Sequence, residues 1–310
     1  MNGTACFILK TNGVAMSNYS NSKFQEDENT SWFKVKNIIK PGSTVLDIGC
    51  SSGNFGKVLI DQKGCVVDGI ELDKGDYEIA KNNLRYVYNM NIENDNIDVF
   101  SEKYKYIYFG DVIEHLVYPV RTLKKVKSLL AEDGGVLFSI PNMAYISVRL
   151  DLLRGGFDYG ETGLLDKTHL HFYDLNEVHR VFEDAGYSIK ILDYVERDLP
   201  SETLKYELND IGLKANDKFL KSAKGLEASA YQFVGLAIPV FKYIKSKPRI
   251  ELSPQINEME KHFHYLDSVH KEQIKAHKKR IKELENNNKS LEEHIKILEN
   301  KGFIDRVLGK

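Results

Sequence analysis

Three short stretches of the 310-residue chain place chemically reactive side chains close together. The first is DIGCSSGNFG, residues 47–56, in which a carboxylate precedes a glycine-rich turn. The second is DVIEH, residues 111–115, and the third is LLDKTHLHFYD, residues 164–174. Both combine carboxylates with imidazoles, which can take a proton from a substrate or hold a cation.

The glycine-rich stretch fits two different functions. Gly49-Cys50-Ser51-Ser52-Gly53 satisfies the G-x-S-x-G pattern of a hydrolase nucleophile elbow, with Ser51 as the nucleophile. Such an elbow also needs an oxyanion loop upstream, where this chain offers only a polar segment and one short helix. The same residues make a glycine-rich turn between a strand and a helix, the place where α/β proteins hold nucleotide-like cofactors. We therefore favour a cofactor loop.

The acidic residues around this turn indicate which cofactor it holds. The glycines at 49, 53 and 56 do not match the G-x-G-x-x-G pattern of dinucleotide sites. Glu71 ends the next predicted strand and can accept hydrogen bonds from two ribose hydroxyls. Asp47 would repel a diphosphate and attract an ammonium group. A ligand with a ribose at one end and an ammonium group at the other is S-adenosylmethionine (SAM).

Alternating strands and helices must position these residues. Strands are predicted at 44–49, 65–72, 104–110, 136–140, 187–195 and 228–239. Helices are predicted at 32–39, 54–61, 76–84, 119–130 and 174–187, and the polar segment 200–228 is also expected to be helical. This alternation favours right-handed crossovers and a parallel sheet. The expected fold class is α/β, a Rossmann-like, doubly wound and mostly parallel sheet over residues 31–240.

Composition excludes several classes of protein. Lys and Arg number 43 against 45 Asp and Glu, so no basic surface for nucleic acid is expected. The three cysteines form no CxxC pair, which suits a reducing cytosol and predicts a cytoplasmic protein. No apolar run reaches the roughly 18 residues of a transmembrane segment. Residues 1–30 are rich in Asn and Ser and are expected to be flexible.

The sequence changes character after Pro248. Residues 256–300 contain no Gly or Pro. Apolar residues occupy a and d positions of a heptad at Ile274, Ile281, Leu284, Leu291, Ile295 and Leu298, with Asn288 at an a position. This pattern predicts a C-terminal coiled-coil helix over 256–300, after a linker at 241–255 and before a short tail at 301–310. The chain would form a homo-oligomer or bind a partner protein through it. The alternative is a single solvated helix docked on its own domain.

Four stretches together resemble the motif series of class I SAM-dependent methyltransferases. They are VLDIGCSSGNFG, VDGIELD, FGDVIEHLVYP and GGVLFSIPN, in order and at the expected spacing. The resemblance is greatest to the branch that holds ubiquinone-biosynthesis O-methyltransferases and bacterial polysaccharide-cluster enzymes. GLLDKTHLHFYDLNEV and AYQFVGLAIP resemble the polysaccharide subset. The coiled coil lies outside this resemblance.

The resemblance implies roles for individual residues around SAM. Those expected at the methionine end are Asp47, Gly49, Cys50, Ser51 and Gly53. Glu71 would bind the ribose hydroxyls, and Leu72 would pack against adenine. Asn91 stands where an acidic residue usually meets the adenine amine, and Ile92 would pack on the ring. Asp111 would close the pocket near the sulfonium.

The second and third stretches supply candidates for the chemical step. Methyl transfer to a hydroxyl requires alignment of the acceptor and removal of its proton. Candidate bases are His115, His169 and His171, with Asp166 in the same loop. Because His169 and His171 are two residues apart, an extended segment would place them on the same side.

A metal ion is a second use for these side chains. In ubiquinone-type relatives a similar acidic-acidic-His cluster is associated with a divalent metal. The resemblance therefore implies Glu114 and His115 as ligands of an ion such as Mg²⁺. The structural alternatives are that His115 orients its loop and that Glu114 is an acid at a helix N-terminus.

The function expected from the sequence is SAM-dependent O-methylation of a sugar or glycan intermediate of surface polysaccharide synthesis. One alternative acceptor is a quinone or another small aromatic molecule. A different class of function is a non-catalytic adaptor that uses a methyltransferase fold to present the coiled coil. Retention of Asp47, the glycines and Glu71 argues against the adaptor, because an inactive pocket need not keep them.

Overall fold

The computed structural model describes residues 9–11, 14–16 and 27–240. The chain divides into two compact units, residues 1–248 and 249–310, and all described residues belong to the first. The predicted linker, coiled coil and tail lie outside the described residues and remain predictions.

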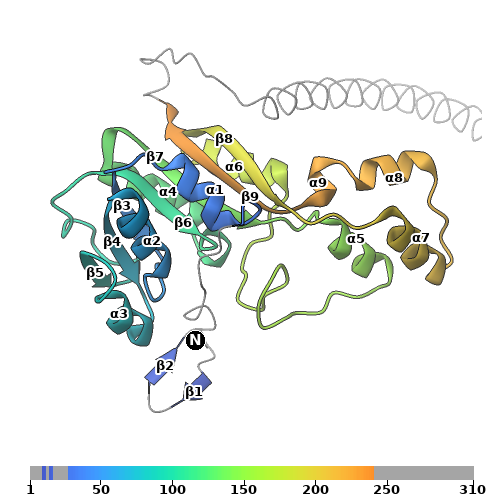
Figure 1. Cartoon of the computed structure of the whole chain (residues 1–310), viewed down its shortest axis with the longest axis horizontal. Helices are drawn as coiled ribbons and strands as arrows, with labels where there is room; N and C mark the ends of the chain where they lie inside the picture. Colours follow the sequence, from blue (N-terminus) through green and yellow to red (C-terminus); the bar gives the residue numbers. More distant parts are fainter. Residues whose placement is uncertain (1–8, 12–13, 17–26, 241–310) are drawn as a thin grey trace, which may run out of the picture. The chain divides into compact units, whose positions relative to one another are not determined.

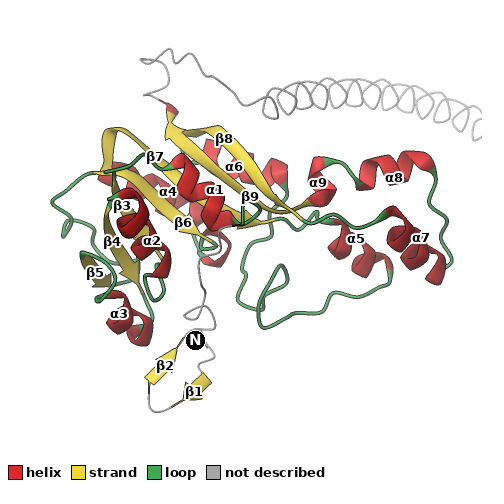
Figure 2. Ribbon diagram, viewed as in Figure 1, coloured by secondary structure: helices red, strands yellow, loops and turns green. Residues whose placement is uncertain are grey.

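A seven-stranded sheet forms the centre of the first unit (Figures 1 and 2). Its strands are β3 (Thr44–Ile48), β4 (Val66–Glu71), β5 (Tyr86–Asn89), β6 (Tyr104–Gly110), β7 (Leu130–Pro141), β8 (Tyr187–Glu196) and β9 (Ala230–Pro239). The order across the sheet is β5-β4-β3-β6-β7-β9-β8. Strands β3 to β7 run parallel, and β9 is antiparallel to both of its neighbours. The predicted Rossmann-like, mostly parallel sheet is therefore confirmed.

The strand order reverses between β3 and β6, which lie side by side. In open α/β sheets, ligands bind at such a switch point, outside the carboxyl ends of the strands. The glycine-rich turn follows β3, and Asp111 follows β6. The fold thus brings the first two reactive stretches to the same edge of the sheet.

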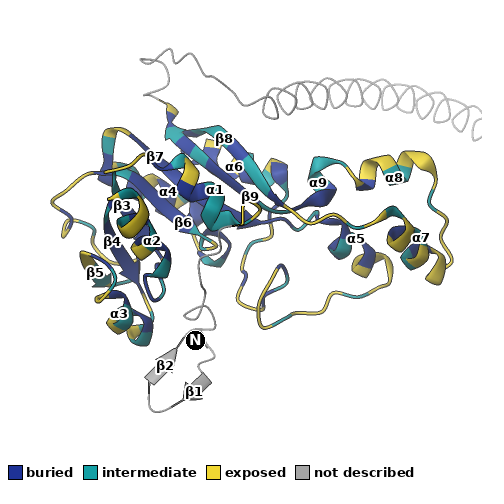
Figure 3. Ribbon diagram, in the orientation of Figure 1, coloured by how far each residue is buried: buried dark blue, intermediate teal, exposed yellow. Residues whose placement is uncertain are grey.

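Helices cover both faces of this sheet and also form an extension beyond it. The described helices are α1 (Ser31–Ile38), α2 (Asn54–Lys63), α3 (Lys74–Ala80), α4 (Pro119–Val126), α5 (Ile146–Leu153), α6 (Leu175–Asp184), α7 (Ser201–Asp210), α8 (Asp217–Ala223) and α9 (Leu226–Ser229). Leu137 of β7 belongs to a buried cluster with Phe55 of α2, while the next residue, Phe138, contacts Phe182 of α6 at 4.5 Å between ring centroids. Because successive strand residues point to opposite faces, these contacts place α2 and α6 on opposite sides. Figure 3 shows the resulting buried strands.

Four helices form a separate apolar core beyond the carboxyl end of β7 (Figure 1). The cluster joins residues of α5, α7, α8 and α9, among them Tyr145, Val148, Leu204, Leu208, Ala223 and Ala228. These helices come from two connections, residues 142–174 between β7 and α6 and residues 197–229 between β8 and β9. This helical extension therefore adds surface next to the edge of the sheet where the reactive stretches lie.

Some local predictions differ from the structure. The helix predicted over 119–130 ends at Val126, and a 3-10 turn, Lys127–Leu129, leads directly into β7. Leu130 is already paired with Tyr104 of β6, so strand pairing overrides the helical pattern of the segment. Strand β5 and helix α5 were not predicted, and a short hairpin, β1 (Leu9–Thr11) with β2 (Val14–Met16), lies in the segment expected to be flexible. No helix in the described part of the chain is long and apolar enough to cross a membrane.

Candidate functional site

The turn after β3 is held in an unusual backbone conformation. Gly49 has a φ of +70°, and its N–H donates to the carbonyl of Ile70 in β4 at 2.8 Å. Within residues 27–240, Ser51 (φ +48°) and Asp111 (φ +55°) are the non-glycine residues with positive φ. Both follow strands at the switch point of the sheet. Backbone strain of this kind persists where surrounding structure enforces it and clusters at functional sites.

Gly49 also has no room for a side chain. A methyl group there would lie 2.6 Å from Cγ2 of Val112, inside van der Waals contact. Gly64 is a matched control, because its φ is +61° but no atom lies within 4 Å of an added methyl. We expect Gly49→Ala to lower the free energy of unfolding by about 1–3 kcal/mol more than Gly64→Ala, since only the first adds overpacking to backbone strain. Thermal unfolding of the two variants measures this, and equal losses would contradict the close contact.

Two buried carboxylates meet at the ends of β3 and β4. Asp47 is 4% exposed, and burial together with the nearby charge of Glu71 raises its pKa to about 8. Burial also raises the pKa of Glu71, against the backbone N–H groups of Asp73 and Ser51, which each donate to its carboxylate at 2.7 Å. Neither carboxylate forms an ion pair within the described part of the chain. A cationic ligand would compensate this pair of acids.

The residues of this turn differ in how their side chains could meet SAM. The Ser51 hydroxyl donates to the carboxylate of Asp76 of α3 at 2.9 Å, an arrangement that holds the turn in place. Cys50 is buried in the core, and a methyl group on Gly69 would lie 2.5 Å from its Sγ. The Cys50 side chain therefore packs away from the ligand, and only its backbone can line the methionine end. Gly53 is the N-cap of α2 and has a φ of +75°, which glycine adopts readily. The absence of a side chain there would let a ligand approach the backbone closely.

The expected adenine end is only partly open. Leu72 is 65% exposed just beyond β4, so its side chain is available to pack on a ring. The amide oxygen of Asn91 accepts from the N–H of Glu93 at 2.8 Å, and Ile92 is buried. The side-chain oxygen of Asn91 thus already accepts one hydrogen bond within its own loop. To bind the adenine amine as well, this oxygen would have to accept a second hydrogen bond with its other lone pair.

Asp111 is fixed in place by a distant strand. Its carboxylate accepts a hydrogen bond from Nε2 of Gln232 in β9, and its N–H donates to the carbonyl of Ser139 at 3.1 Å. Reduced hydration raises its pKa to about 6, although the residue keeps a solvent-exposed side. Gln232 is a site residue that the sequence analysis missed. A polar side chain within the apolar run AYQFVGLAIP was the available signal.

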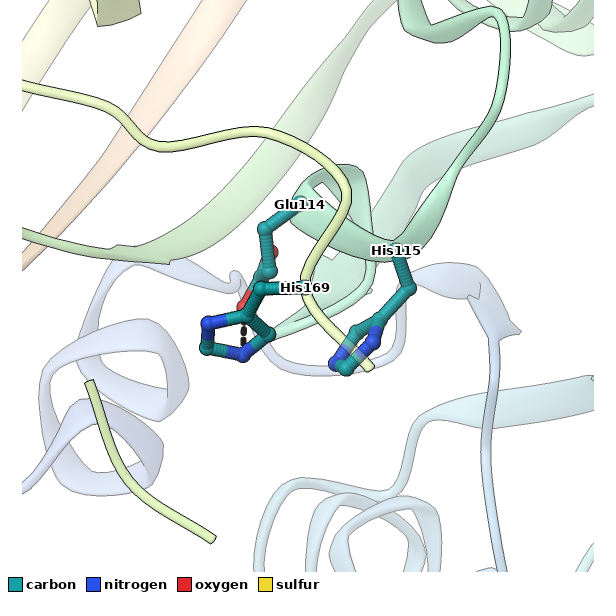
Figure 4. A group of neighbouring side chains, drawn as sticks. All are labelled: Glu114, His115 and His169. Atoms are coloured by element: carbon teal, nitrogen blue, oxygen red, sulfur yellow. Dashed lines mark ion pairs between the residues drawn. The ribbon is translucent and has the colours of Figure 1, made fainter. Parts of the chain in front are cut away.

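Glu114, His115 and His169 form a compact cluster (Figure 4). Glu114 and His115 belong to the 3-10 turn η1 (Ile113–His115) after β6, and His169 comes from the loop before α6. The ligand atoms of the three side chains lie within 4.8 Å of one another, and His169 Nε2 is 4.0 Å from Glu114 Oε1. Glu114 is fully buried, and neither carboxylate oxygen has a hydrogen-bond partner. Such a carboxylate is costly unless a proton or a cation compensates it.

Hydrogen bonds to backbone carbonyls orient both imidazoles. His169 Nδ1 lies 3.1 Å from the carbonyl oxygen of Leu164, and His115 Nδ1 lies 3.2 Å from that of Thr168. Since a carbonyl only accepts, we assign the proton to Nδ1 in both rings, which leaves each Nε2 with a free lone pair. Burial lowers the pKa of both histidines and raises that of Glu114 well above its ordinary range. Without a cation, burial therefore favours the uncharged form of all three side chains.

The other two candidate residues of this loop lie elsewhere. Asp166 is buried, and its Oδ1 accepts from the N–H of Thr168 at 2.8 Å and from its hydroxyl at 2.6 Å, so it shapes the loop that holds His115. The prediction that His169 and His171 face the same side was wrong. The N–H groups of Leu170 and His171 both donate to the carbonyl of Glu114, so the segment turns instead of staying extended. His171 lines a groove between α4 and α6.

Comparisons with known proteins bear on the fold and the family of the chain. Residues 33–190 match a family model described as a methyltransferase domain. The ubiquinone biosynthesis O-methyltransferase of Haemophilus ducreyi is 26% identical over 149 residues, which covers 39% of this chain and 63% of the relative. Phosphoethanolamine N-methyltransferase 2 of Caenorhabditis elegans is 26% identical over 124 residues, covering 38% of this chain and 28% of the relative. The chain thus spans less than two thirds of the length of either relative.

The comparison with solved structures gives a further match. The TehB-like SAM-dependent methyltransferase of Corynebacterium glutamicum is 15% identical, with a TM-score of 0.43 over 72% of this chain and 92% of that protein.

Proposed function

The chain belongs to the methyltransferase-domain family, and from this premise we propose that it transfers a methyl group from SAM to a hydroxyl of a sugar or glycan intermediate. SAM is proposed as the methyl donor because two buried carboxylates, Asp47 and Glu71, lie at the ends of adjacent strands. SAM carries a positive charge on its ammonium group and hydroxyls on its ribose, which match these two acids.

The residues at the switch point would divide the binding of SAM between them. Asp47 would attract the ammonium group, Glu71 would accept hydrogen bonds from the ribose hydroxyls, and the glycines would let the backbone approach. When bound, SAM supplies a methyl group on a positively charged sulfur, which makes the carbon reactive. Asp111 would lie near that sulfur, held by Gln232. The chain then has to orient the acceptor and remove its proton.

We propose His115 as the proton acceptor. Its ring is partly exposed, its Nε2 lone pair is free, and Thr168 fixes its orientation. Because burial lowers its pKa, His115 is neutral and competent as a base at neutral pH. Glu114 and His169 lie behind it and can share the positive charge that forms when it takes a proton.

A divalent cation is a second candidate role for the cluster, and one observation favours it. Both oxygens of the fully buried Glu114 lack a partner, and both histidines direct a free Nε2 into the same space. Imidazoles that donate Nδ1–H to a carbonyl are typical of metal ligands. Two imidazoles and one carboxylate suit Mn²⁺, Fe²⁺ or Zn²⁺, whereas Mg²⁺ prefers oxygen ligands. When bound, such an ion would lower the pKa of a nearby hydroxyl.

An assay with methyl-labelled SAM tests the proposed reaction. The protein would be incubated with pools of nucleotide sugars, lipid-linked glycans and catechols, and labelled products would be separated. Label in a sugar supports the glycan acceptor. Label in a catechol would replace it with the aromatic acceptor that the curated O-methyltransferase relative suggests. If SAM binds but no pool becomes labelled, the proposed class of acceptor is wrong. If SAM does not bind, the result favours a non-catalytic adaptor.

The heptad pattern of residues 256–300 supports a further part of the proposal, self-association or partner binding through a coiled coil. We expect the full chain to sediment as an oligomer and a chain ending at residue 250 to sediment as a monomer. An oligomeric truncated chain would contradict this role.

A further inference from the structure

A groove of about 630 Å³ lies between α4 and α6, outside the site described above. Its lining residues are Val117, Tyr118, Pro119, Val120, Arg121, Lys124, His171, Tyr173, Glu177, Arg180, Val181 and Asp184. This volume falls within the range of sites that bind small molecules. Neither the proposed SAM site nor the proposed proton transfer uses these side chains.

The cations of the groove are only partly neutralised. Arg180 forms an ion pair with Glu177 on the same helix. Arg121 and Lys124, both exposed on α4, form no ion pair with an acidic side chain among residues 27–240. Asp184, at the end of α6, is the remaining acid of the lining. The groove therefore carries two unpaired cations against one unpaired carboxylate, before any charge on His171.

One wall of the groove is apolar and aromatic. Tyr118 is 53% exposed, and the guanidinium of Arg121 lies 4.2 Å from the centre of its ring. Pro119, Val120 and Val181 extend this surface. A site that combines a flat aromatic wall with free cations suits a ligand that has both an apolar or aromatic part and an anionic part.

The groove and the Glu114 cluster are built from the same two segments of the chain. Tyr118 follows His115 by three residues, and His171 follows His169 by two. The carbonyl of Glu114 accepts from the N–H groups of Leu170 at 2.8 Å and His171 at 3.1 Å, which fastens the two segments to each other. A ligand in the groove would thus extend toward the proposed base.

We propose that this groove binds a diphosphate attached to an apolar or aromatic group, the chemistry that nucleotide-activated and prenyl-linked sugars share. Arg121 and Lys124 bind the diphosphate, and the wall around Tyr118 receives the base or the prenyl chain. The sugar then lies toward His115. This inference rests on the proposed glycan acceptor. It adds that the enzyme holds this acceptor by its diphosphate and by the group attached to that diphosphate.

Calorimetry with three probes on the full chain tests the inference. The probes are inorganic pyrophosphate, UDP-glucose and geranyl diphosphate. We expect UDP-glucose or geranyl diphosphate to bind more tightly than pyrophosphate, and the tighter of the two identifies the source of the diphosphate. Arg121→Gln/Lys124→Gln should weaken that binding at least about tenfold, because charge-assisted hydrogen bonds to phosphate are lost. Both residues are exposed, so the variant should fold normally.

Lys218→Gln/Lys221→Gln is the matched control, since it removes the same charge from the exposed surface of α8. It should leave binding of all three probes unchanged. Equal weakening by both variants, or no binding of any probe to the wild type, would overturn the inference. Pyrophosphate binding as tightly as the larger probes would overturn the role of the apolar wall. SAM should bind the Arg121/Lys124 variant normally, so failure of the groove is distinguishable from failure of the SAM site.

Discussion

Asp47→Asn is expected to weaken SAM binding by at least about 100-fold, because a buried charge pair with the ammonium group is lost. The same change should raise the melting temperature of the ligand-free protein above pH 8. A carboxylate with a raised pKa holds more protons in the folded state than in the unfolded state, so stability falls as pH rises from about 4 to about 8. Asparagine does not ionise and escapes this loss. Calorimetry and thermal unfolding measure the two effects.

The pH dependence of SAM binding gives an independent check on Asp47. The ammonium group binds the ionised carboxylate, whose fraction grows with pH and reaches one half at its pKa of about 8. SAM affinity of the wild type should therefore rise roughly 25-fold between pH 6 and pH 7.5, while that of Asp47→Asn stays flat. Asp61→Asn, on the exposed surface of α2, is the control and should behave as the wild type. A variant at Asp47 that binds SAM normally would remove the basis for the assigned orientation of the ligand.

His115→Asn is expected to lower kcat by about 10²–10⁴, the usual contribution of a general base, while SAM affinity is unchanged. As the pH is lowered, the wild-type rate should begin to fall only below the ordinary imidazole pKa of about 6.5, because burial lowers the pKa of His115. Glu114→Gln should lower kcat too, since an amide cannot ionise to balance the positive charge that His115 acquires when it takes a proton. At high pH its melting temperature should exceed that of the wild type, because the raised pKa of the Glu114 carboxyl makes its ionisation destabilising and an amide does not ionise.

Chelation separates the two roles of this cluster. If His115 acts without a cation, dialysis against EDTA leaves the rate unchanged. If the cluster holds Mn²⁺, Fe²⁺ or Zn²⁺, EDTA abolishes activity and one of these ions restores it. His179→Asn on α6 is the control histidine and should keep the wild-type rate. Full activity in both His115→Asn and Glu114→Gln would contradict either role.

The sequence predicted the parts of the fold that depend on local patterns. Asp174 accepts from the N–H of Glu177 and begins α6, and Gly186 follows its end with a φ of +77°, both as the capping pattern predicts. The turn after β3 was placed correctly because its glycines and the buried strand before it are adjacent in sequence. Strand β5 was missed because it is a short edge strand in which no side chain is fully buried.

The parts of the site that depend on distant contacts were less accessible. Gln232 reaches Asp111 across 121 positions of sequence, and Thr168 reaches His115 across 53. No local pattern encodes such pairs. His169 and His171 were predicted on one side because two-residue spacing was read as an extended strand, whereas hydrogen bonds to Glu114 turn the chain between them. Asp166 was proposed as a catalytic residue, and its contacts with Thr168 show how it shapes the loop.

Titration of SAM into the wild type and into Glu71→Gln at pH 7.5 tests whether SAM binds at the ends of β3 and β4. We expect one SAM per chain in the wild type and a loss of about 2–5 kcal/mol of binding free energy in the variant, because ribose hydroxyls lose a charged acceptor. Equal binding to both proteins, or no heat of binding to the wild type, would contradict the assignment of the carboxyl ends of β3 and β4 as the SAM site.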